Sequence, residues 1–240
     1  MSEKILNILQ LYPHDMNIYG DWGNVLVLQK RAMWHGYKVR LLTYNPGDSF
    51  PDNVDIVVGG GGQDSGQSAI QDDLQKIAPI LKKLADENVP MLMICGLYQL
   101  FGNYFLTNSG EKIPGIGIFD LETRASDERM IGNIVTKSDE FGEIIGYENH
   151  SGKTFLAPGT KPFGVVQKGA GNNGQDTSEG ARYKNVIGTY LHGSLLPKNP
   201  QIADWIIEQA SVHTYGEVQS NDLDDVFARA ARKVAVNRPR

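Results

Sequence analysis

The sequence predicts an α/β fold in which helices flank a central, mostly parallel sheet. Short apolar runs alternate along the first hundred residues with longer segments of helical spacing, which indicates βαβ units. One run, residues 89–95, is continuously apolar, as is typical of a parallel strand buried on both faces. From about residue 113 to 167 the chain is strand-like and punctuated by glycine. We therefore expect a β-rich, more antiparallel second half.

The elements expected in the first half follow one another along the chain. The predicted strands are residues 4–11, 38–44, 55–60 and 89–95. The predicted helices are residues 24–36, 68–87 and a segment that starts at residue 98. Gly36 suits a C-cap and Ser68 an N-cap, while Pro79 is expected to kink the second helix.

Beyond the β-rich part, the pattern predicts a loop, one more strand and helices. Residues 168–182 are polar and glycine-rich, and residues 186–193 form an apolar run that ends in glycine. Residues 199–212 have helical spacing. We expect one compact domain over residues 1–240, with an appended C-terminal helix within 213–240.

Composition and charge argue against several classes of function. With 40% hydrophobic and 21% charged residues the chain is ordinary for a globular protein, and a net charge of −5 without a basic stripe makes nucleic acid an unexpected partner. A single cysteine fits a reducing cytoplasm, and no apolar run suits a signal peptide or a membrane span. The scattered histidines, without CxxC or HExxH, predict no metal site.

The only cysteine, Cys95, stands where an apolar strand breaks into glycine and a helix. Carboxyl ends of parallel strands meet at one edge of a sheet, where ligands bind, and a thiolate there can attack a substrate. His192 ends another apolar strand and could be its base, because a Cys–His pair is the minimum for acyl transfer from a carboxamide. Taken alone, the cysteine also suits a small core residue and the histidine a surface or capping residue.

Residues 59–67, GGGGQDSGQ, form a glycine run directly after a predicted strand. Glycines let backbone N–H groups approach a bound group closely. The run lacks the lysine of a phosphate-binding P-loop. It fits one side of an oxyanion hole opposite the Cys95 turn, with a flexible turn as the alternative.

The segment ICGLYQL around Cys95, together with YLHG around His192, resembles the class I glutamine amidotransferases of the cobyric-acid-synthase-like branch. Longer stretches resemble the glutaminase subunits of lipid II isoglutaminyl synthases: LQLYPHDMNIYGDWGNVLVL, GGGGQDSGQ, GYENHSGKTFL and GTYLHGSLLPKNPQIADWI. The resemblance covers roughly residues 5–210 and implies the flavodoxin-like fold of class I glutamine amidotransferases.

The resemblance implies that the chain hydrolyses L-glutamine to glutamate and ammonia. Cys95 would attack the carboxamide, and His192 would activate the thiol and protonate the departing ammonia. Backbone N–H groups of Gly60, Gly61 and Gly96 would hold the oxyanion, an effect worth about 3–4 kcal/mol per donor.

The resemblance also implies two contacts with the substrate glutamine. Arg129 matches a family arginine that engages the substrate, and a guanidinium can bind an α-carboxylate through two hydrogen bonds. A surface arginine near a turn is the alternative for this residue. Gln99 follows the cysteine by one helical turn and would line the glutamine pocket.

Two departures from the family pattern concern the turn and the histidine. Met93 and Leu97 stand where glycines usually flank the nucleophile, so these side chains need room against a neighbouring strand. Ser194 occupies the place of the glutamate that usually follows the histidine. By residue type, Asp21 or Glu148 could orient the histidine instead, and a Cys–His dyad is equally open.

The resemblance finally implies a partner. Such glutaminases work as heterodimers with a Mur-ligase-like subunit that binds ATP and lipid II, so no cofactor is expected on this chain. Ammonia would convert the D-glutamate of the stem peptide to D-isoglutamine in peptidoglycan synthesis, at the inner face of the bacterial membrane. The alternatives are a glutaminase that serves another synthetase, such as one for corrinoid amidation, and a catalytically inactive scaffold subunit.

Overall fold

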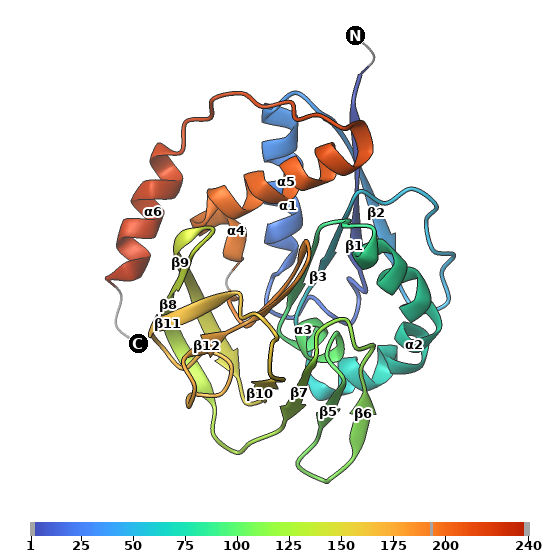
Figure 1. Ribbon diagram of the computed structural model, residues 1–240, viewed down its shortest axis with the longest axis vertical. Coiled ribbons are helices and arrows are strands. Elements are labelled where there is room, and N and C mark those ends of the chain that lie inside the picture. The colour runs from blue at the N-terminus through green and yellow to red at the C-terminus, as the bar shows by residue number, and fades with distance from the viewer. Residues whose placement is uncertain (1–2, 193, 238–240) are drawn as a thin grey trace.

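The computed structural model describes residues 3–192 and 194–237 and contains a central sheet of the order β13-β14-β4-β3-β1-β2 (Figure 1). Its strands are β1 (Ile5–Leu11), β2 (Lys38–Tyr44), β3 (Ile56–Gly59), β4 (Met91–Ile94), β13 (Ala181–Tyr183) and β14 (Val186–Thr189). Strands β2, β1, β3, β4 and β14 run parallel, and β13 is antiparallel at the edge. The predicted α/β fold with a mostly parallel sheet is thus confirmed.

Two groups of helices cover the central sheet (Figure 1). The first group is α1 (Trp22–Trp34), α4 (Leu195–Lys198) and α5 (Pro200–Tyr215), which pack against one another. The second group is α2 (Asp64–Asp86) and α3 (Gly96–Leu100). The crossovers from β1 to β2 and from β3 to β4 run in opposite directions along the sheet. Because such crossovers are right-handed, α1 and α2 lie on opposite faces.

The core lies where the sheet is covered on both faces. Every residue of β3, β4 and β14 is buried, in agreement with the continuously apolar sequence of these strands. Burying an aliphatic side chain of this size stabilises the fold by about 1.5–3 kcal/mol relative to leaving it exposed. The functional strand ends are therefore held by the most deeply packed part of the protein.

The β-rich second half forms two four-stranded sheets (Figure 1). One contains β5 (Tyr104–Leu106), β6 (Lys112–Pro114), β7 (Leu121–Arg124) and β10 (Lys153–Leu156). The other contains β8 (Met130–Ser138), β9 (Gly142–His150), β11 (Gly164–Lys168) and β12 (Ser178–Glu179). Most pairings in these sheets are antiparallel, as the glycine-punctuated sequence predicts.

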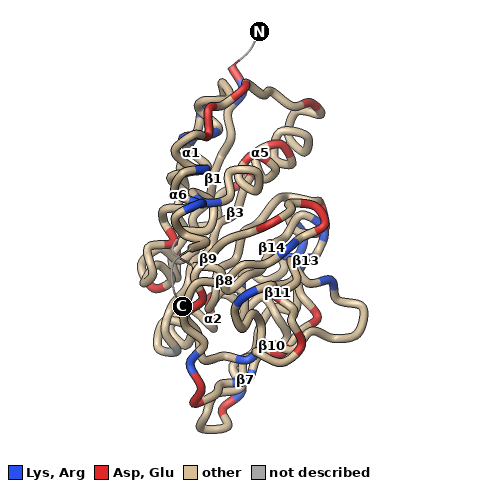
Figure 2. The backbone as a smooth tube through the Cα atoms, turned by 90° about the vertical axis from the view of Figure 1, so that its left-hand side faces the viewer, with Lys and Arg blue, Asp and Glu red and all other residues tan. Residues whose placement is uncertain are grey.

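A last helix, α6 (Val226–Val236), packs on α4, β8 and β9. Arg232 fixes it by donating to the carbonyl of Lys198 at 3.3 Å and to Asn199 Oδ1 at 2.8 Å. Basic and acidic segments are interspersed on the face that Figure 2 shows. Among the described residues, no helix has the combination of length and apolar character that a bilayer crossing requires.

Two predicted helices differ from the observed ones. Helix α2 begins at Asp64, after Gln63 as N-cap, so Ser68 lies inside the helix and the predicted N-cap was wrong. The helix expected from residue 98 is the five-residue α3, and a strand begins at Tyr104. Backbone N–H groups of residues 116–119 bind the carbonyls at the end of α3 and so end the helix.

The strand and the loop expected near the C-terminal part are also shorter than predicted. Strand β14 ends at Thr189 instead of continuing through residues 190–192, and residue 193 of the predicted strand lies outside the described residues. The predicted loop over 168–182 includes β12 and the first residues of β13. Asn172 explains this order, because its side chain donates to the carbonyl of Gly180 at 3.0 Å and accepts from the Gly180 N–H at 2.9 Å.

Candidate active site

The carboxyl ends of four parallel strands meet at one edge of the central sheet. The segment after β1 carries Asp21, and β3 runs into the glycines at 60–62. Cys95 directly follows β4, and His192 follows β14. The order of the strands reverses between β1 and β3, which is where ligands bind in open α/β sheets.

Cys95 forms the turn between β4 and α3 in a backbone conformation that side chains rarely adopt, with φ 49° and ψ −104°. Such strained residues cluster at functional sites, where the surrounding structure fixes them. Here the Cys95 N–H donates to the carbonyl of Thr189 at 2.9 Å, and its own carbonyl accepts from Gln99 N at 2.9 Å. The turn is therefore held by the neighbouring strand and by the helix that follows.

The room for Met93 and Leu97 beside this turn comes from Gly59 on the neighbouring strand β3. Met93 pairs in register with Gly59 of β3 on one side and with Gly188 of β14 on the other. A Cβ atom at Gly59 would overlap Leu97 Cδ1 and stand 2.9 Å from Met93 Sδ. The small residue that gives these two side chains room is thus Gly59 on β3.

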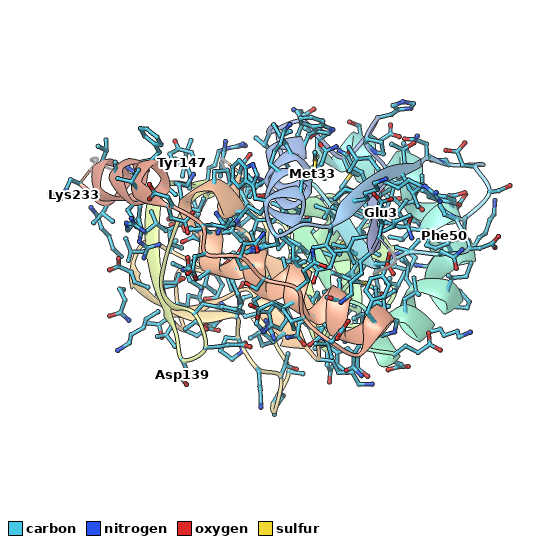
Figure 3. All side chains as sticks on the ribbon, turned by 90° about the horizontal axis from the view of Figure 1, so that it is seen from above. Glu3, Met33, Phe50, Asp139, Tyr147 and Lys233 are labelled. Carbon is cyan, nitrogen blue, oxygen red and sulfur yellow. The ribbon has the colours of Figure 1, made fainter. Side chains whose placement is uncertain are left out.

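His192 is fixed through its backbone after it leaves the central sheet. Its N–H donates to the carbonyl of Tyr147 at 2.7 Å, and the Tyr147 N–H donates back at 3.3 Å. The Tyr147 side chain projects outward from the molecule (Figure 3). The His192 side chain lies inside, and its ring centroid is 4.5 Å from that of Tyr19. Strand β9 therefore positions His192 through backbone hydrogen bonds.

Asp21 is the acid beside His192. Its Oδ1 lies 3.5 Å from His192 Nδ1, and its Oδ2 accepts from the Gly61 N–H at 2.8 Å. Glu148, the other acid considered from the sequence, accepts from the N–H groups of Ala170 and Gly171 at 3.0 and 2.9 Å. Of these two acids, Asp21 is the one that pairs with the histidine.

Gly61 separates the cysteine from the histidine. A Cβ atom at this position would stand 2.8 Å from His192 Cε1 and 3.1 Å from Cys95 Cβ. These separations are shorter than packed side chains adopt, so only glycine lets both groups lie against the same stretch of backbone. The structure therefore brings Cys95 and His192 together, although their sequence positions are far apart.

Charge in this buried pair favours the protonated histidine. Burial acts to lower the pKa of His192, but negative charge at Cys95 and the hydrogen bond and charge of Asp21 outweigh it and raise the pKa to about 10. The imidazole is thus an imidazolium at neutral pH. An imidazolium beside a cysteine and a carboxylate can deliver a proton to a leaving group.

The glycine donors differ from those predicted. The Gly61 N–H is already donated to Asp21, so the prediction that it holds an oxyanion is corrected. Gly62 lines the cavity beside Cys95, while the oxyanion roles of Gly60 and Gly96 stay predictions. A Cβ atom at Gly96 would stand 3.1 Å from the Gly62 nitrogen, so these two backbone amides are neighbours. Gly62 and Gly96 therefore make the pair that could face an oxyanion.

A cavity of about 380 Å³ opens beside Cys95, with Gln99 and Arg129 in its lining. Gln99 is 4% exposed, and its amide accepts from Gln67 Nε2 at 2.7 Å and donates to Tyr190 Oη at 3.0 Å. The structure thus brings Gln99 to the cavity wall with its amide orientation fixed.

Arg129 lies at the exposed mouth of the same cavity, just before β8. Its Nε donates to Asn149 Oδ1 at 2.8 Å, and its Nη2 reaches Tyr19 Oη at 3.4 Å. These contacts hold the guanidinium at the cavity. A cation there suits a carboxylate on a ligand whose other end reaches Cys95.

Sequence reasoning missed three residues of this site: Tyr19, Gln67 and Tyr190. Tyr19 belongs to NIYGD and Gln67 closes GGGGQDSGQ, so both were inside stretches singled out for other reasons. Tyr190 precedes the histidine by two residues. A signal existed for the first two, since polar residues directly after strand ends commonly line sites. Within the described part of the chain, no cluster of His, Cys, Asp and Glu could hold a metal ion.

Comparison with known proteins supports the resemblance seen in the sequence. Residues 7–200 match the model of the CobB/CobQ-like glutamine amidotransferase domain. The chain is 38% identical over 234 residues to the lipid II isoglutaminyl synthase (glutamine-hydrolyzing) subunit GatD of Staphylococcus aureus, covering 97% of this chain and 96% of that one. The GatD subunit of Streptococcus pneumoniae is also 38% identical, over 93% of this chain and 88% of that one.

Solved structures show the same fold at low sequence identity. A glutamine amidotransferase structure superposes with a TM-score of 0.59 at 12% identity, over 85% of this chain and 99% of that one. A glutamine amidotransferase from Thermotoga maritima gives a TM-score of 0.53 at 12% identity, over 96% and 93%. The predicted class I glutamine amidotransferase fold is confirmed.

Proposed function

We propose, because this chain belongs to the CobB/CobQ-like glutamine amidotransferase family, that it is the glutaminase subunit of a lipid II isoglutaminyl synthase. It hydrolyses L-glutamine to L-glutamate and ammonia. The observation that carries this proposal is the 38% identity to a GatD subunit over 97% of the chain. A cobyric acid synthase of Methanothermobacter thermautotrophicus, in contrast, matches 65% of this chain and only 32% of its own length.

Cys95 starts the reaction as a thiolate. Its sulfur forms a bond to the carboxamide carbon of glutamine, and the carbonyl oxygen becomes an oxyanion held by the N–H groups of Gly62 and Gly96. The imidazolium of His192 then gives its proton to the nitrogen as the C–N bond breaks, and ammonia leaves. A γ-glutamyl thioester remains on the sulfur.

Water completes the cycle. The now neutral His192 takes a proton from water as the oxygen bonds to the thioester carbon, and the C–S bond breaks. Glutamate leaves, the thiolate of Cys95 returns, and the histidine is again protonated. Asp21 supports both steps because its carboxylate favours the charged imidazole. Arg129 binds the α-carboxylate of the substrate, and Gln99 forms part of the wall.

Ammonia passes to a separate synthetase subunit. We propose a Mur-ligase-like partner that binds ATP and lipid II and amidates the D-glutamate of the stem peptide to D-isoglutamine. The name of the GatD relatives, a subunit of a glutamine-hydrolysing synthase, supports the need for a partner. The glutaminase then works in the bacterial cytoplasm, at the inner face of the membrane through its partner. No cofactor is assigned to this chain.

Two measurements test the proposal. The chain, purified with its partner, is expected to release glutamate from L-glutamine, and Cys95→Ala is expected to abolish the release. Activity that survives in Cys95→Ala would contradict the role of the thiol, and a wild-type chain that hydrolyses nothing would favour an inactive scaffold. After depletion of the protein, mass spectrometry of muropeptides is expected to show loss of amidation at the second stem residue. Unchanged amidation would reject the lipid II assignment.

A further inference from the structure

Gln67 lies in the first turns of α2 and carries no role in the mechanism above. Its side chain is 2% exposed and belongs to the wall of the cavity that holds Cys95. Its backbone N–H donates to the carbonyl of Gln63 at 3.0 Å, so helix formation fixes its position. Burying a polar group costs free energy unless it is paired. The burial of the Gln67 amide at the cavity wall therefore needs an explanation.

One end of the Gln67 amide is paired, and the other end is buried without a hydrogen-bond partner among the described residues. Nε2 donates to Gln99 Oε1 at 2.7 Å, and the Gln99 amide donates in turn to Tyr190 Oη at 3.0 Å. Tyr190 is itself bonded to Thr154 at 2.7 Å, which makes a chain of buried hydrogen bonds. Among the residues that the structure describes, no donor reaches Gln67 Oε1. Leaving such a buried acceptor unpaired costs free energy, which a ligand donor would recover.

The position of this amide selects the part of the ligand that it meets. A Cβ atom at Gly96 would stand 3.1 Å from Gln67 Nε2 and 3.1 Å from the Gly62 nitrogen. The Gln67 amide is therefore next to the backbone donors proposed for the oxyanion. The amino-acid end of the substrate belongs beside Arg129, which lines the same cavity. Gln67 accordingly faces the reacting carboxamide.

We propose that Gln67 Oε1 accepts a hydrogen bond from the carboxamide N–H₂ of glutamine and so distinguishes glutamine from glutamate. The inference rests on the proposed glutaminase function. Glutamate presents a carboxylate oxygen where glutamine presents an N–H donor, so two acceptors would meet in a buried site. A site built around a hydrogen bond discriminates strongly against a ligand that lacks the matching group. The same mismatch weakens the hold on the glutamate product and favours its release.

The test measures binding without turnover. In the full chain with Cys95→Ala, calorimetry gives the dissociation constants of L-glutamine and L-glutamate. Adding Gln67→Met, which keeps the size but removes the acceptor, is expected to weaken glutamine binding by at least about tenfold, from the loss of a hydrogen bond in a buried site. Glutamate binding is expected to stay the same or to tighten. Gln75→Met, at an exposed glutamine of the same helix, is the matched control and should change neither value.

A second variant separates ligand recognition from support of Gln99. Gln67→Glu keeps an acceptor at the cavity but loses the donor to Gln99 Oε1, so it is expected to retain the preference for glutamine. If Gln67→Met weakens the binding of both ligands equally, or if Gln67→Glu loses the preference for glutamine, the proposal is wrong. Gln67 would then serve only to support Gln99. Thermal melting checks that each variant folds. Ammonia release by the unmodified complex is measured separately, and its absence would count against the glutaminase function and not against the selectivity of Gln67.

Discussion

Asp21 Oδ1 lies 3.5 Å from His192 Nδ1, and both side chains are 2% exposed. The acid follows β1 and the histidine follows β14, two strands that do not pair with each other in the central sheet. In a sheet of parallel strands, both groups nevertheless reach the same edge. The missing glutamate at Ser194 is therefore replaced by an acid from the opposite end of the sequence.

Replacing Asp21 by asparagine should weaken catalysis and shift its pH dependence. Asparagine keeps an oxygen for the Gly61 N–H but removes the negative charge that helps to raise the pKa of His192 to about 10. The histidine then loses its proton at a lower pH, so the alkaline limb of kcat/KM for glutamine should move to lower pH. At neutral pH we expect a loss in kcat of at least about tenfold, as for acids that orient a catalytic histidine.

The comparison variant is Asp72→Asn, at an exposed acid on α2. It should leave both kcat and the pH profile unchanged. A profile for Asp21→Asn that overlays the wild-type profile, at any level of activity, would show that the carboxylate does not act through the charge of His192. In that event the cysteine and histidine work as a dyad.

Gly59 should be essential for the turn at Cys95. A Cβ atom there overlaps Leu97 Cδ1 and approaches Met93 Sδ, so Gly59→Ala should lower the free energy of unfolding by about 1–3 kcal/mol, as overpacked cores do. Adding Leu97→Ala should return part of that loss, because the overlapping methyl groups are gone. Urea denaturation of the two single variants and the double variant measures the coupling. Strictly additive losses would mean that Gly59 is not what makes room for the turn.

The sequence was sufficient for the parts of the site that follow from strand order. Cys95 and His192 each close an apolar run, and parallel strands bring such ends together, so their proximity could be predicted. The partner acid could not, because β1 is followed by a segment without regular structure whose path depends on tertiary contacts. Asp21 was one of two candidates by residue type, and it is the approach of its Oδ1 to His192 Nδ1, at 3.5 Å, that distinguishes it from Glu148.

The turn and the short helix show the limits of local patterns. The family pattern led us to look for glycine beside Cys95 along the chain, whereas the structure has Gly59 and Gly188 beside Met93 across the sheet. Similarly, the helical spacing after Cys95 did not indicate that the backbone N–H groups of residues 116–119 would bind the last carbonyls of α3. Both features depend on contacts between segments that are distant in the sequence, and the local periodicity of apolar residues does not predict such contacts.

Arg129 should govern glutamine affinity more than the chemical step. The guanidinium lies at the cavity mouth, held by Asn149, and it does not touch the cysteine turn. Arg129→Ala should raise KM for glutamine by about tenfold or more with a smaller effect on kcat, since a charge-assisted hydrogen bond is worth about 1.5–3 kcal/mol. Arg129→Lys should restore little, because an ammonium cannot make the bidentate contact. Arg124→Ala, at an exposed arginine of β7, is the control, and unchanged kinetics in Arg129→Ala would remove this residue from the site.

His150 should make the fold sensitive to acid. Burial lowers the pKa of His150 to about 3, and positive charge at His192 adds to this, while its ring stacks on Tyr190 with centroids 3.5 Å apart. A folded-state pKa below the unfolded value of about 6.5 means that the unfolded chain binds the proton first. Stability is therefore complete above pH 6.5 and falls as the pH drops toward 3, by up to about 1.4 kcal/mol per pH unit. Urea denaturation at pH 7 and 5 should show a smaller fall for His150→Gln, but not for the exposed His213→Gln; equal falls in all three proteins would contradict this.

The most direct test of the pairing of Cys95 and His192 is a single methyl group between them. Gly61→Ala adds a Cβ atom 2.8 Å from His192 Cε1 and 3.1 Å from Cys95 Cβ, so one of the two groups must move. A shift of this size in a catalytic pair can cost about a hundredfold in rate, which we expect in kcat for glutamine hydrolysis. Because the positive charge of His192 would no longer stabilise a thiolate at Cys95, alkylation of Cys95 by iodoacetamide should slow as well. Thermal melting and glutamine binding show whether the fold and the cavity persist. Full activity in Gly61→Ala would mean that the cysteine and the histidine do not react across this glycine.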